Sequence, residues 1–525
     1  MTGTRTLTTL LLHSTRIRLV LWASLIPVLL ALGAASIKSL YPTQTDWDAY
    51  AAIADLVPAQ IAFNGPPTAL TTLGGIIIFE TGWLLMLAAC VANILLTVRL
   101  TRGQEEAGAL EVLRAGRVSA GAPLVAVAVL IVSLNALLGV STAAVLVLAG
   151  TSVLGAVTYG AALFAASTFF GAIAACTAQL SERARTASGL ALAVLGVSFL
   201  ARAIGDVSDA PSAAILTWIS PLGWAQSTEP FGANRWLPIA LLLGATAVTS
   251  GAAWQLNATR DLGAGVIAGR PGRVRAARWA TTPMGLQVRL ARGGILAWTA
   301  GVVILSGAFG AMATTADDFA ASSEATTDLI ASFGGTSLSD AFIVFSLVIV
   351  GLIAAGCTTS LILRLHADEE AGRLAILVTA PQRRATVAAS YVLTGFTAGF
   401  LLLATGGLAL GAAYAAGTGD WSALTAICAS SLAHFPAVMV LGGVAAVGAA
   451  LTSRGAALAW GVYAITAILT VLGPALSLPE WAVFWSVFDH VASYPAVAWN
   501  VSLITIGAAL AVAAAVGFTR RDMRS

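Results

Sequence analysis

The sequence predicts an all-α polytopic membrane protein, in which twelve transmembrane helices form two parallel-repeat halves of six helices each. The first observation is composition: of 525 residues, 58% are hydrophobic and 10% are charged, whereas an average soluble domain is about 25% charged. The second is that apolar runs of ~20 residues, the length that crosses a hydrocarbon layer of about 30 Å, follow one another along the chain. The third is an acidic, glycine-containing segment that occurs twice, at corresponding places in the two halves.

The apolar runs predict twelve spans. The first run is too long for a cleavable signal peptide and lacks a small-residue cleavage site, so it is expected to remain as a span. Gly and Ala are abundant within the runs, as expected where membrane helices pack closely. Only Gly150 and Thr151 separate the third span from the fourth. The spans are expected at 19–37, 71–98, 122–147, 151–178, 187–205 and 236–254, and then at 295–313, 341–363, 386–415, 424–450, 456–474 and 499–518.

Charge in the loops predicts the orientation, because Lys and Arg accumulate in cytoplasmic loops. With a cytoplasmic N-terminus, the outer side keeps only Lys38, Arg202 and Arg235 as cations. The outer loops are instead acidic, for example at Asp46, Asp206 and Asp317. An even number of spans then places both termini in the cytoplasm.

The two acidic segments predict an internal repeat. Glu105-Glu106-Ala107-Gly108 aligns with Glu369-Glu370-Ala371-Gly372, and each follows the second span of its half. Two halves in the same orientation are related by an axis along the membrane normal. The expected organisation is a first half at 1–258, a basic cytoplasmic linker at 259–284 and a second half at 285–525. The linker is expected to lie on anionic lipid headgroups.

Segments that flank the spans leave alternatives open. "RTLTTLLLHSTRIR" and "GLQVRLARGG" place Arg among apolar residues just before the first span of each half, which favours short interfacial helices over disordered tails. "SPLGW" and "FDHVASYPAVAW", before the last span of each half, contain Pro and Trp suited to re-entrant or interfacial helices. An ordinary connecting loop is the alternative for both.

Both acidic segments are expected to form short cytoplasmic helices that bind another protein. Their carboxylates lie in the first turn, where the helix dipole favours negative charge. Leu110 and Leu113 share one helical face by their three-residue spacing, as do Leu374 and Leu377. These apolar side chains suit a groove on a partner better than water. The alternative is a solvated interfacial helix that only joins two spans.

The chain itself is not predicted to be an enzyme. A Walker A loop requires a lysine after glycines, and Lys38 in "SIKSL" is the only lysine of the chain. The four cysteines lie in apolar runs and the four histidines are scattered, so neither a disulfide framework nor a metal site is expected. No catalytic residue, no cofactor in this chain and no nucleic-acid partner are predicted.

Several motifs together resemble a known family. The paired "EEAG" segments, "WISPLGWAQSTEPFGANRW", the "TRDLGAG" exit from the sixth span and the terminal "RRDM" occur in this order. They resemble the fused-half permeases of bacterial ABC exporters, of the actinobacterial type associated with resistance to tetronasin and other polyketide antibiotics. The resemblance covers nearly the whole chain and implies a multi-pass protein of the bacterial plasma membrane that exports hydrophobic or amphiphilic small molecules.

The resemblance also implies partners. Two copies of a separately encoded ATPase subunit would carry ATP and Mg, and the loop after each second span would be the coupling helix. It therefore implies that Glu105, Glu106 and Gly108, with Glu369, Glu370 and Gly372, contact those subunits. The second copy has Arg373 and Ala375 where the first has Ala109 and Glu111, which predicts unequal contacts.

Glu80 is a carboxylate within the second span, where charge is costly. With the nearby Trp83 it is a candidate substrate or gate contact, or a proton site; alternatively it only hydrogen-bonds to a neighbouring helix. Its counterpart in the second half is Val344. Glu80 also supports a rival class, the proton-coupled twelve-span drug transporter. A non-transporting scaffold or lipid-modifying enzyme has less support, because no catalytic set of side chains occurs in any loop.

Overall fold

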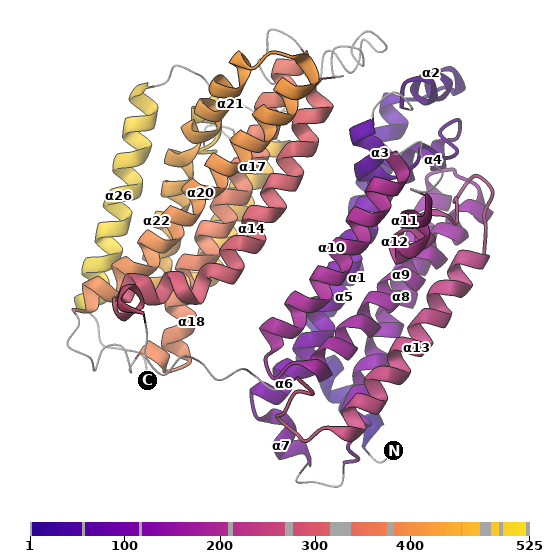
Figure 1. Cartoon of the computed structure of the whole chain (residues 1–525), viewed down its shortest axis with the longest axis horizontal. Coiled ribbons are helices and arrows are strands. Elements are labelled where there is room, and N and C mark those ends of the chain that lie inside the picture. The colour runs from indigo at the N-terminus through magenta and orange to yellow at the C-terminus, as the bar shows by residue number, and fades with distance from the viewer. Residues whose placement is uncertain are drawn as a thin grey trace. The chain divides into compact units, whose positions relative to one another are not determined.

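The chain folds as two compact helical units, Met1–Gly272 and Arg273–Ser525 (Figure 1). The computed structural model describes residues 3–54, 58–114, 118–207, 214–267, 277–314, 338–374, 383–452, 454–472, 485–492 and 497–520. No strand occurs among these residues. The boundary between the units falls within the basic stretch that joins the two halves of the sequence.

The first unit contains long helices that coincide with the first six predicted spans. Short helices lie at their ends. The long elements are α1 (Thr4–Leu40), α4 (Leu73–Ile77) with the π-helix η1 (Ile78–Gly82) and α5 (Trp83–Leu100), α8 (Ala122–Leu148), α9 (Val153–Leu180), α10 (Ala184–Val207) and α13 (Leu237–Thr259). The short ones are α2 (Gln44–Ala54), α3 (Pro58–Asn64), α6 (Arg102–Glu106), α7 (Ala109–Arg114), α11 (Ala214–Ile219) and α12 (Pro221–Gln226).

The second unit repeats this order. It begins with the 3₁₀ helix η2 (Arg278–Thr281), and its fourth span is divided at His434. The elements are α14 (Pro283–Ala313), α17 (Leu338–Ile362), α18 (Arg364–Glu370), α20 (Arg384–Thr418), α21 (Ser422–Ala433), α22 (Phe435–Leu451), α23 (Gly455–Leu472), α25 (Asp489–Ala492) and α26 (Val497–Arg520).

Length and composition of these helices confirm a polytopic membrane protein. Within the described ranges, 11 helices are long and apolar enough to cross a membrane, and each coincides with a predicted span. The remaining predicted span, 456–474, coincides with the shorter apolar helix Gly455–Val471. The third and fourth spans are separate helices, and Lys38 Nζ donates a hydrogen bond to the carbonyl of Ala149 at their junction (3.2 Å). The cytoplasmic location of both termini stays a prediction.

The flanking segments are helical where the structure describes them. The segments before the first and seventh spans are continuous with those spans in α1 and α14. "SPLGW" forms the start of α12, where the Ser220 hydroxyl accepts a hydrogen bond from the amide of Gly223 (3.1 Å). In "FDHVASYPAVAW", residues 489–492 form α25, and 493–496 lie outside the described residues.

The packing order within each unit is the same, which supports the internal repeat. The first span packs on the third in both units, as α1 on α8 and α14 on α20. The second span packs on the fourth, as α5 on α9 and α17 on α22. The sixth also packs on the fourth, as α13 on α9 and α26 on α22. A duplicated sequence has therefore produced a duplicated helix arrangement.

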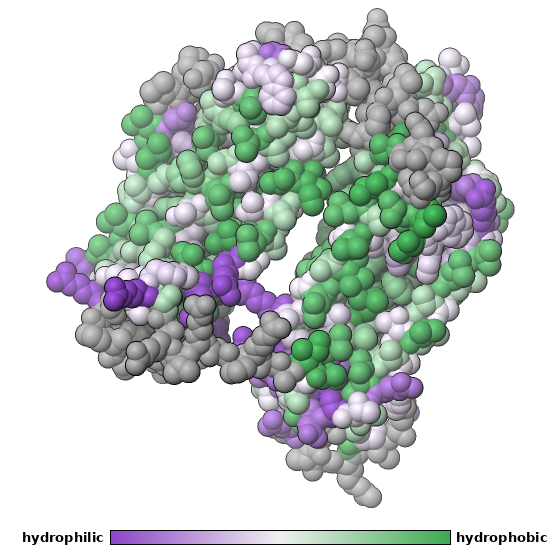
Figure 2. All heavy atoms as spheres, in the orientation of Figure 1, coloured by the Kyte–Doolittle hydropathy of each residue, from purple (hydrophilic) through white to green (hydrophobic). Residues whose placement is uncertain are grey.

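Each unit exposes apolar side chains along its length. Hydrophobic residues cover much of the visible flank of each unit, and hydrophilic residues gather towards the ends (Figure 2). Large exposed side chains of this kind include Ile17, Val140 and Leu296. A water-soluble protein rarely exposes so large an apolar surface, whereas lipid chains are a suitable solvent for it.

Close approach of α8 and α9 depends on two glycines. A Cβ at Gly160 would lie 2.3 Å from the carbonyl oxygen of Gly139, and one at Gly139 would lie 2.7 Å from that of Gly160. We expect Gly160→Ala to lower the free energy of unfolding by about 1–3 kcal/mol, because the helices must separate. The measurement is thermal unfolding in detergent. Gly196→Ala on α10 is the control, since a Cβ there meets nothing within 4 Å, and equal unfolding temperatures of the two variants would contradict the prediction.

Candidate functional site

The acidic segment of the first unit lies at the end of α5 and folds as two short helices, α6 and α7. Sequence alone predicted a single helix. Gly108 separates the two, with a left-handed φ of 72°, a conformation that glycine adopts without a steric penalty. The chain thus turns immediately after Glu105 and Glu106, and nothing lies within 4 Å of where a Gly108 side chain would be.

Glu105 is buried and held by two arginines. Arg260 donates to both of its carboxylate oxygens, at 2.6 and 2.8 Å, and Arg102 Nη1 lies 3.1 Å from Oε2. The amide of Gly263 donates a further hydrogen bond to Oε1 at 2.7 Å. Only 3% of the Glu105 side chain is exposed. A bidentate, charge-assisted pair of this kind is among the stronger polar interactions in proteins.

These contacts join the ends of three spans. Arg260, which follows α13, also donates through Nε to Gln179 Oε1 near the end of α9 (2.7 Å). Arg102, which follows α5, donates through Nε to the carbonyl of Ala178 (2.9 Å). We refer to Arg102, Glu105, Gln179 and Arg260 as the charged clamp. A displacement of α6 must therefore also displace the ends of α9 and α13, or break the clamp.

The remaining residues of the first segment differ in exposure. Glu106 and Ala107 are exposed, whereas Leu110 is buried. Leu113 belongs to α7, but its side chain lies outside the described residues. Both adjacent glutamates were predicted to contact a partner. Glu106 is exposed at the surface, whereas the Glu105 carboxylate binds arginines inside the unit.

The segment of the second unit has the same alternation. Glu369 is buried and Glu370 is exposed, with Glu370 Oε1 3.2 Å from His366 Nε2. Gly372 follows with a left-handed φ of 70°. Leu374 is fully buried, and Leu377 lies outside the described residues. The two units therefore repeat the local geometry as well as the sequence.

Polar contacts around the two segments differ. His366 occupies the position of Arg102, and Asp368 occupies that of Gln104. Asp368 contacts the exposed Arg373 through Oδ1 (2.8 Å) and accepts a hydrogen bond from Tyr391 on α20 through Oδ2 (2.7 Å). The second segment is thus held to the third span of its unit by Asp368, a contact that Gln104 does not reproduce among the hydrogen bonds of the first segment.

Glu80 lies in the π-helix η1, which directly follows α4. Helices α4 and α6 lie towards opposite ends of the unit (Figure 1). Its Oε1 accepts hydrogen bonds from Tyr50 of α2 and from Gln60 Nε2 of α3 (2.8 Å). Burial and then the charge of Glu80 raise the pKa of the Tyr50 phenol well above its usual range, so Tyr50 remains the donor. π-Helical turns often occur at functional sites.

Trp83 does not join Glu80. Its ring packs edge-on against Tyr159 of α9, with 6.1 Å between ring centroids, and Tyr159 donates to the carbonyl of Gly82 (2.8 Å). Hydrogen bonding to a neighbouring helix was the alternative to a functional role for Glu80. The structure shows such bonds, to α2 and α3. A role of Glu80 or Trp83 in gating or substrate contact stays a prediction.

Two comparisons identify the family. Residues 281–519 match the family described as multidrug efflux system permease Rv1217c, C-terminal domain. The whole chain is 34% identical over 533 residues to the multidrug efflux system permease protein Rv1217c of Mycobacterium tuberculosis, covering 100% of this chain and 96% of that protein. The chain belongs to the family of multidrug efflux system permeases.

As a permease of this family, the protein is a multi-pass transport protein of the plasma membrane. The similarity is to multidrug efflux permeases and not specifically to the tetronasin-type resistance proteins. The finer assignment to that type therefore stays a prediction.

Sequence reasoning missed most of the clamp in this permease. Arg260 stands within "TRDLGAG" and the basic linker, and no local pattern of the sequence pairs it or Gln179 with Glu105. The i,i+3 spacing of Arg102 and Glu105 could have suggested their pairing. Arg202, counted among loop cations, is instead buried within α10, where its Nη2 donates to the carbonyl of Ala62 at the end of α3 (2.8 Å).

Loss of the Glu105 carboxylate should destabilise the permease. Glu105→Ala leaves the buried guanidinium of Arg102 and the partly buried one of Arg260 without their counter-charge, and we expect the free energy of unfolding to fall by about 3–5 kcal/mol. Glu106→Ala is the matched control, because an exposed side chain should change it by no more than about 0.5 kcal/mol. Denaturant unfolding in detergent measures both, and similar losses in the two variants would exclude a structural clamp.

Removal of Glu80 should loosen α2 and α3. Glu80→Ala deletes the oxygen that accepts from Tyr50 and Gln60, so hydrogen exchange of the backbone amides in 44–54 and 58–64 should become faster. Glu80→Gln keeps an acceptor oxygen and should exchange more slowly than Glu80→Ala. Mass spectrometry of deuterated peptides provides the measurement, and unchanged exchange in Glu80→Ala would show that α2 and α3 are held by other contacts.

Proposed function

We propose that this permease is the transmembrane subunit of an ATP-driven ABC exporter that moves hydrophobic or amphiphilic small molecules out of the cell. The relative from Mycobacterium tuberculosis is named a multidrug efflux system permease, which supports efflux of this class of compound. The chain has no Walker A loop, since Lys38 is its only lysine and lacks the preceding glycines. A separate ATPase subunit would therefore supply the energy, with ATP and Mg bound there.

One observation carries this proposal: each unit exposes one glutamate carboxylate at the same point, just after its second span. In each segment a buried glutamate is followed by an exposed one, and a left-handed glycine then turns the chain. The exposed members are Glu106 and Glu370. A matched surface on each of two units suits two copies of one partner better than a single, asymmetric partner.

Connectivity makes these segments suitable for transmitting force. Helix α6 begins two residues after α5 ends, and α18 begins two residues after α17 ends. A partner that moves α6 acts directly on the second span, and through the charged clamp on the ends of α9 and α13. In the proposed mechanism, ATP closes the ATPase pair, the two segments move with it, and the spans alternate between inward and outward access.

Reversal of the two exposed charges should uncouple the proposed complex. Glu106→Arg combined with Glu370→Arg leaves Glu105 and Glu369 in place, so the permease should fold. We expect ATPase subunits to copurify at least about tenfold less, an effect equivalent to about 1.4 kcal/mol of contact free energy. Asp48→Arg reverses an exposed charge of α2, at the opposite end of the unit, and should copurify as the wild type does. Unchanged copurification of the double variant would argue against these segments as the docking surface.

The energy source separates the proposal from its rival. A buried carboxylate such as Glu80, hydrogen-bonded by Tyr50 and Gln60, is the observation that favours a proton-coupled transporter. Efflux of a hydrophobic dye from cells should continue when an uncoupler collapses the proton gradient but ATP is maintained by substrate-level phosphorylation. It should stop when ATP is depleted. Transport by the purified permease alone in liposomes under a pH gradient would instead establish the rival mechanism.

A further inference from the structure

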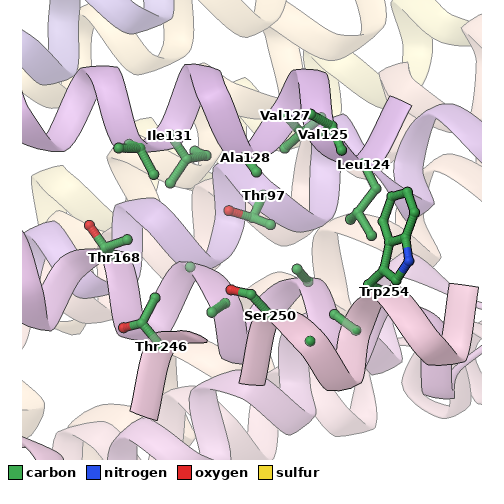
Figure 3. Close-up of a pocket in the computed structure, with 16 residues that line it drawn as sticks. Thr97, Leu124, Val125, Val127, Ala128, Ile131, Thr168, Thr246, Ser250 and Trp254 are labelled. Carbon is green, nitrogen blue, oxygen red and sulfur yellow. The ribbon is translucent and has the colours of Figure 1, made fainter. Parts of the chain in front are cut away.

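The first unit contains a pocket that neither the clamp nor Glu80 explains. It has a volume of about 370 Å³ and lies between α5, α8, α9 and α13 (Figure 3). Trp254 and Leu124 lie at one end of the view, and Ile131 and Thr168 lie towards the other. This volume is within the range of about 300–1,000 Å³ that is typical of pockets for drug-sized molecules.

Small residues create the pocket. Gly171, Ala172 and Ala175 of α9 form one wall, and Ser250, Gly251 and Ala253 of α13 form another. Larger side chains line it from α8, where Leu124 and Val127 lie on the helix face towards it. The Trp254 ring packs against Gly121, where a Cβ would lie 2.2 Å from the indole. Trp254 of α13 therefore reaches the start of α8 at one end of the pocket, and α9 contributes only small residues and Thr168 to the lining.

The pocket contains one buried hydroxyl without a hydrogen-bond partner. Thr97 is 2% exposed, and its Oγ1 has no partner among the described residues. The hydroxyls of Thr168 and Thr246 are instead satisfied by the carbonyls of Phe164 (2.6 Å) and Leu242 (2.8 Å) on their own helices. A buried, unpaired hydroxyl is unfavourable. Its oxygen has almost no accessible surface in the pocket, so an acceptor atom on a bound molecule would pair with it once the Thr97 side chain rotates towards the pocket.

The walls of the pocket lead directly into the charged clamp. Thr97 lies one turn before the end of α5, and its carbonyl accepts a hydrogen bond from the Thr101 hydroxyl (2.7 Å). Arg102 is the next residue. On the opposite wall, Trp254 belongs to α13 and lies six positions before Arg260, the residue that follows this helix. A molecule between α5 and α13 therefore acts on the two helices whose ends Glu105 and Arg260 join.

We propose that this pocket binds a neutral, hydrophobic small molecule of drug size that carries a hydrogen-bond acceptor, such as a carbonyl or ether oxygen, at Thr97. Its identity as an efflux substrate rests on the proposed function; its binding does not. A lipid acyl chain would fill the apolar space but would leave the Thr97 hydroxyl unpaired. The missing acceptor therefore favours a ketone, ester or ether over a plain hydrocarbon chain.

Benzophenone tests the proposal, because it is an apolar aromatic ketone that attaches to nearby C–H bonds on irradiation. The purified permease in lipid nanodiscs is irradiated at rising benzophenone concentrations, and labelled peptides are mapped by mass spectrometry. We expect saturable labelling of peptides that contain 124–132 and 246–254. Thr97→Val keeps the side-chain shape but removes the hydroxyl, and should raise the half-saturating concentration about fivefold.

A second variant fills the pocket. Ala128→Phe places a ring in it from α8 and should abolish saturable labelling. Ala144→Phe introduces the same ring about 24 Å further along α8, at an exposed position that does not line the pocket, and should label as the wild type does. Thermal unfolding checks that each variant is folded, and Thr97→Val decides the matter if Ala128→Phe is not.

Labelling that rises linearly with concentration and is the same in all variants would overturn the proposal and show only a lipid-facing groove. So would saturable labelling that Thr97→Val and Ala128→Phe both leave unchanged. The experiment uses neither ATP nor an ATPase subunit. Its failure would leave the exporter assignment intact, and failure of ATP-driven efflux would leave the binding result intact.

Discussion

The buried charge of Glu105 is the constraint from which the arrangement around α6 follows. A carboxylate that is 3% exposed must be neutralised and hydrogen-bonded. One of its partners begins its own helix, α6, and the other follows a different span. Arg260 satisfies it from the exit of α13, and Arg102 from the exit of α5. Because both arginines also bond to α9, these ends cannot move independently. The segment after the second span is therefore fixed to the ends of α9 and α13, as the proposed transmission of force would require.

Duplication supplied the scaffold, and divergence altered its polar contacts. The same pairs of spans pack together in both units, and each second span ends in the same buried and exposed pair of glutamates. Yet Val344 stands where the first unit has Glu80, and His366 stands where it has Arg102. Apolar packing tolerates such changes because it depends on shape and volume. Two units of one architecture can therefore specialise, and the proposed complex would be symmetric in form but not in chemistry.

Position links the proposed ligand pocket with the proposed docking segment. Both lie at the same end of the first unit, and both use α5 and α13 as walls or anchors. Occupancy that spreads these helices would strain the pairing of Glu105 with Arg260. Conversely, a partner that shifts α6 would reshape the pocket, since coupling between two sites is reciprocal. The pocket and α6 are only a few helical turns apart along α5, so coupling between them needs no long-range network of residues.

The sequence by itself determined the spans, their order, the duplication and the place of the two acidic segments, because lipid imposes one length and one polarity on every crossing helix. Only the tertiary structure decided which of two adjacent glutamates faces inward. Glu105 and Glu106 are chemically identical and differ only in their direction around α6. Arg260, which binds the Glu105 carboxylate, lies 155 residues away in the sequence. The unpaired hydroxyl of Thr97 is hidden for the same reason: a helical threonine usually bonds within its own helix, and no local pattern shows that this one does not.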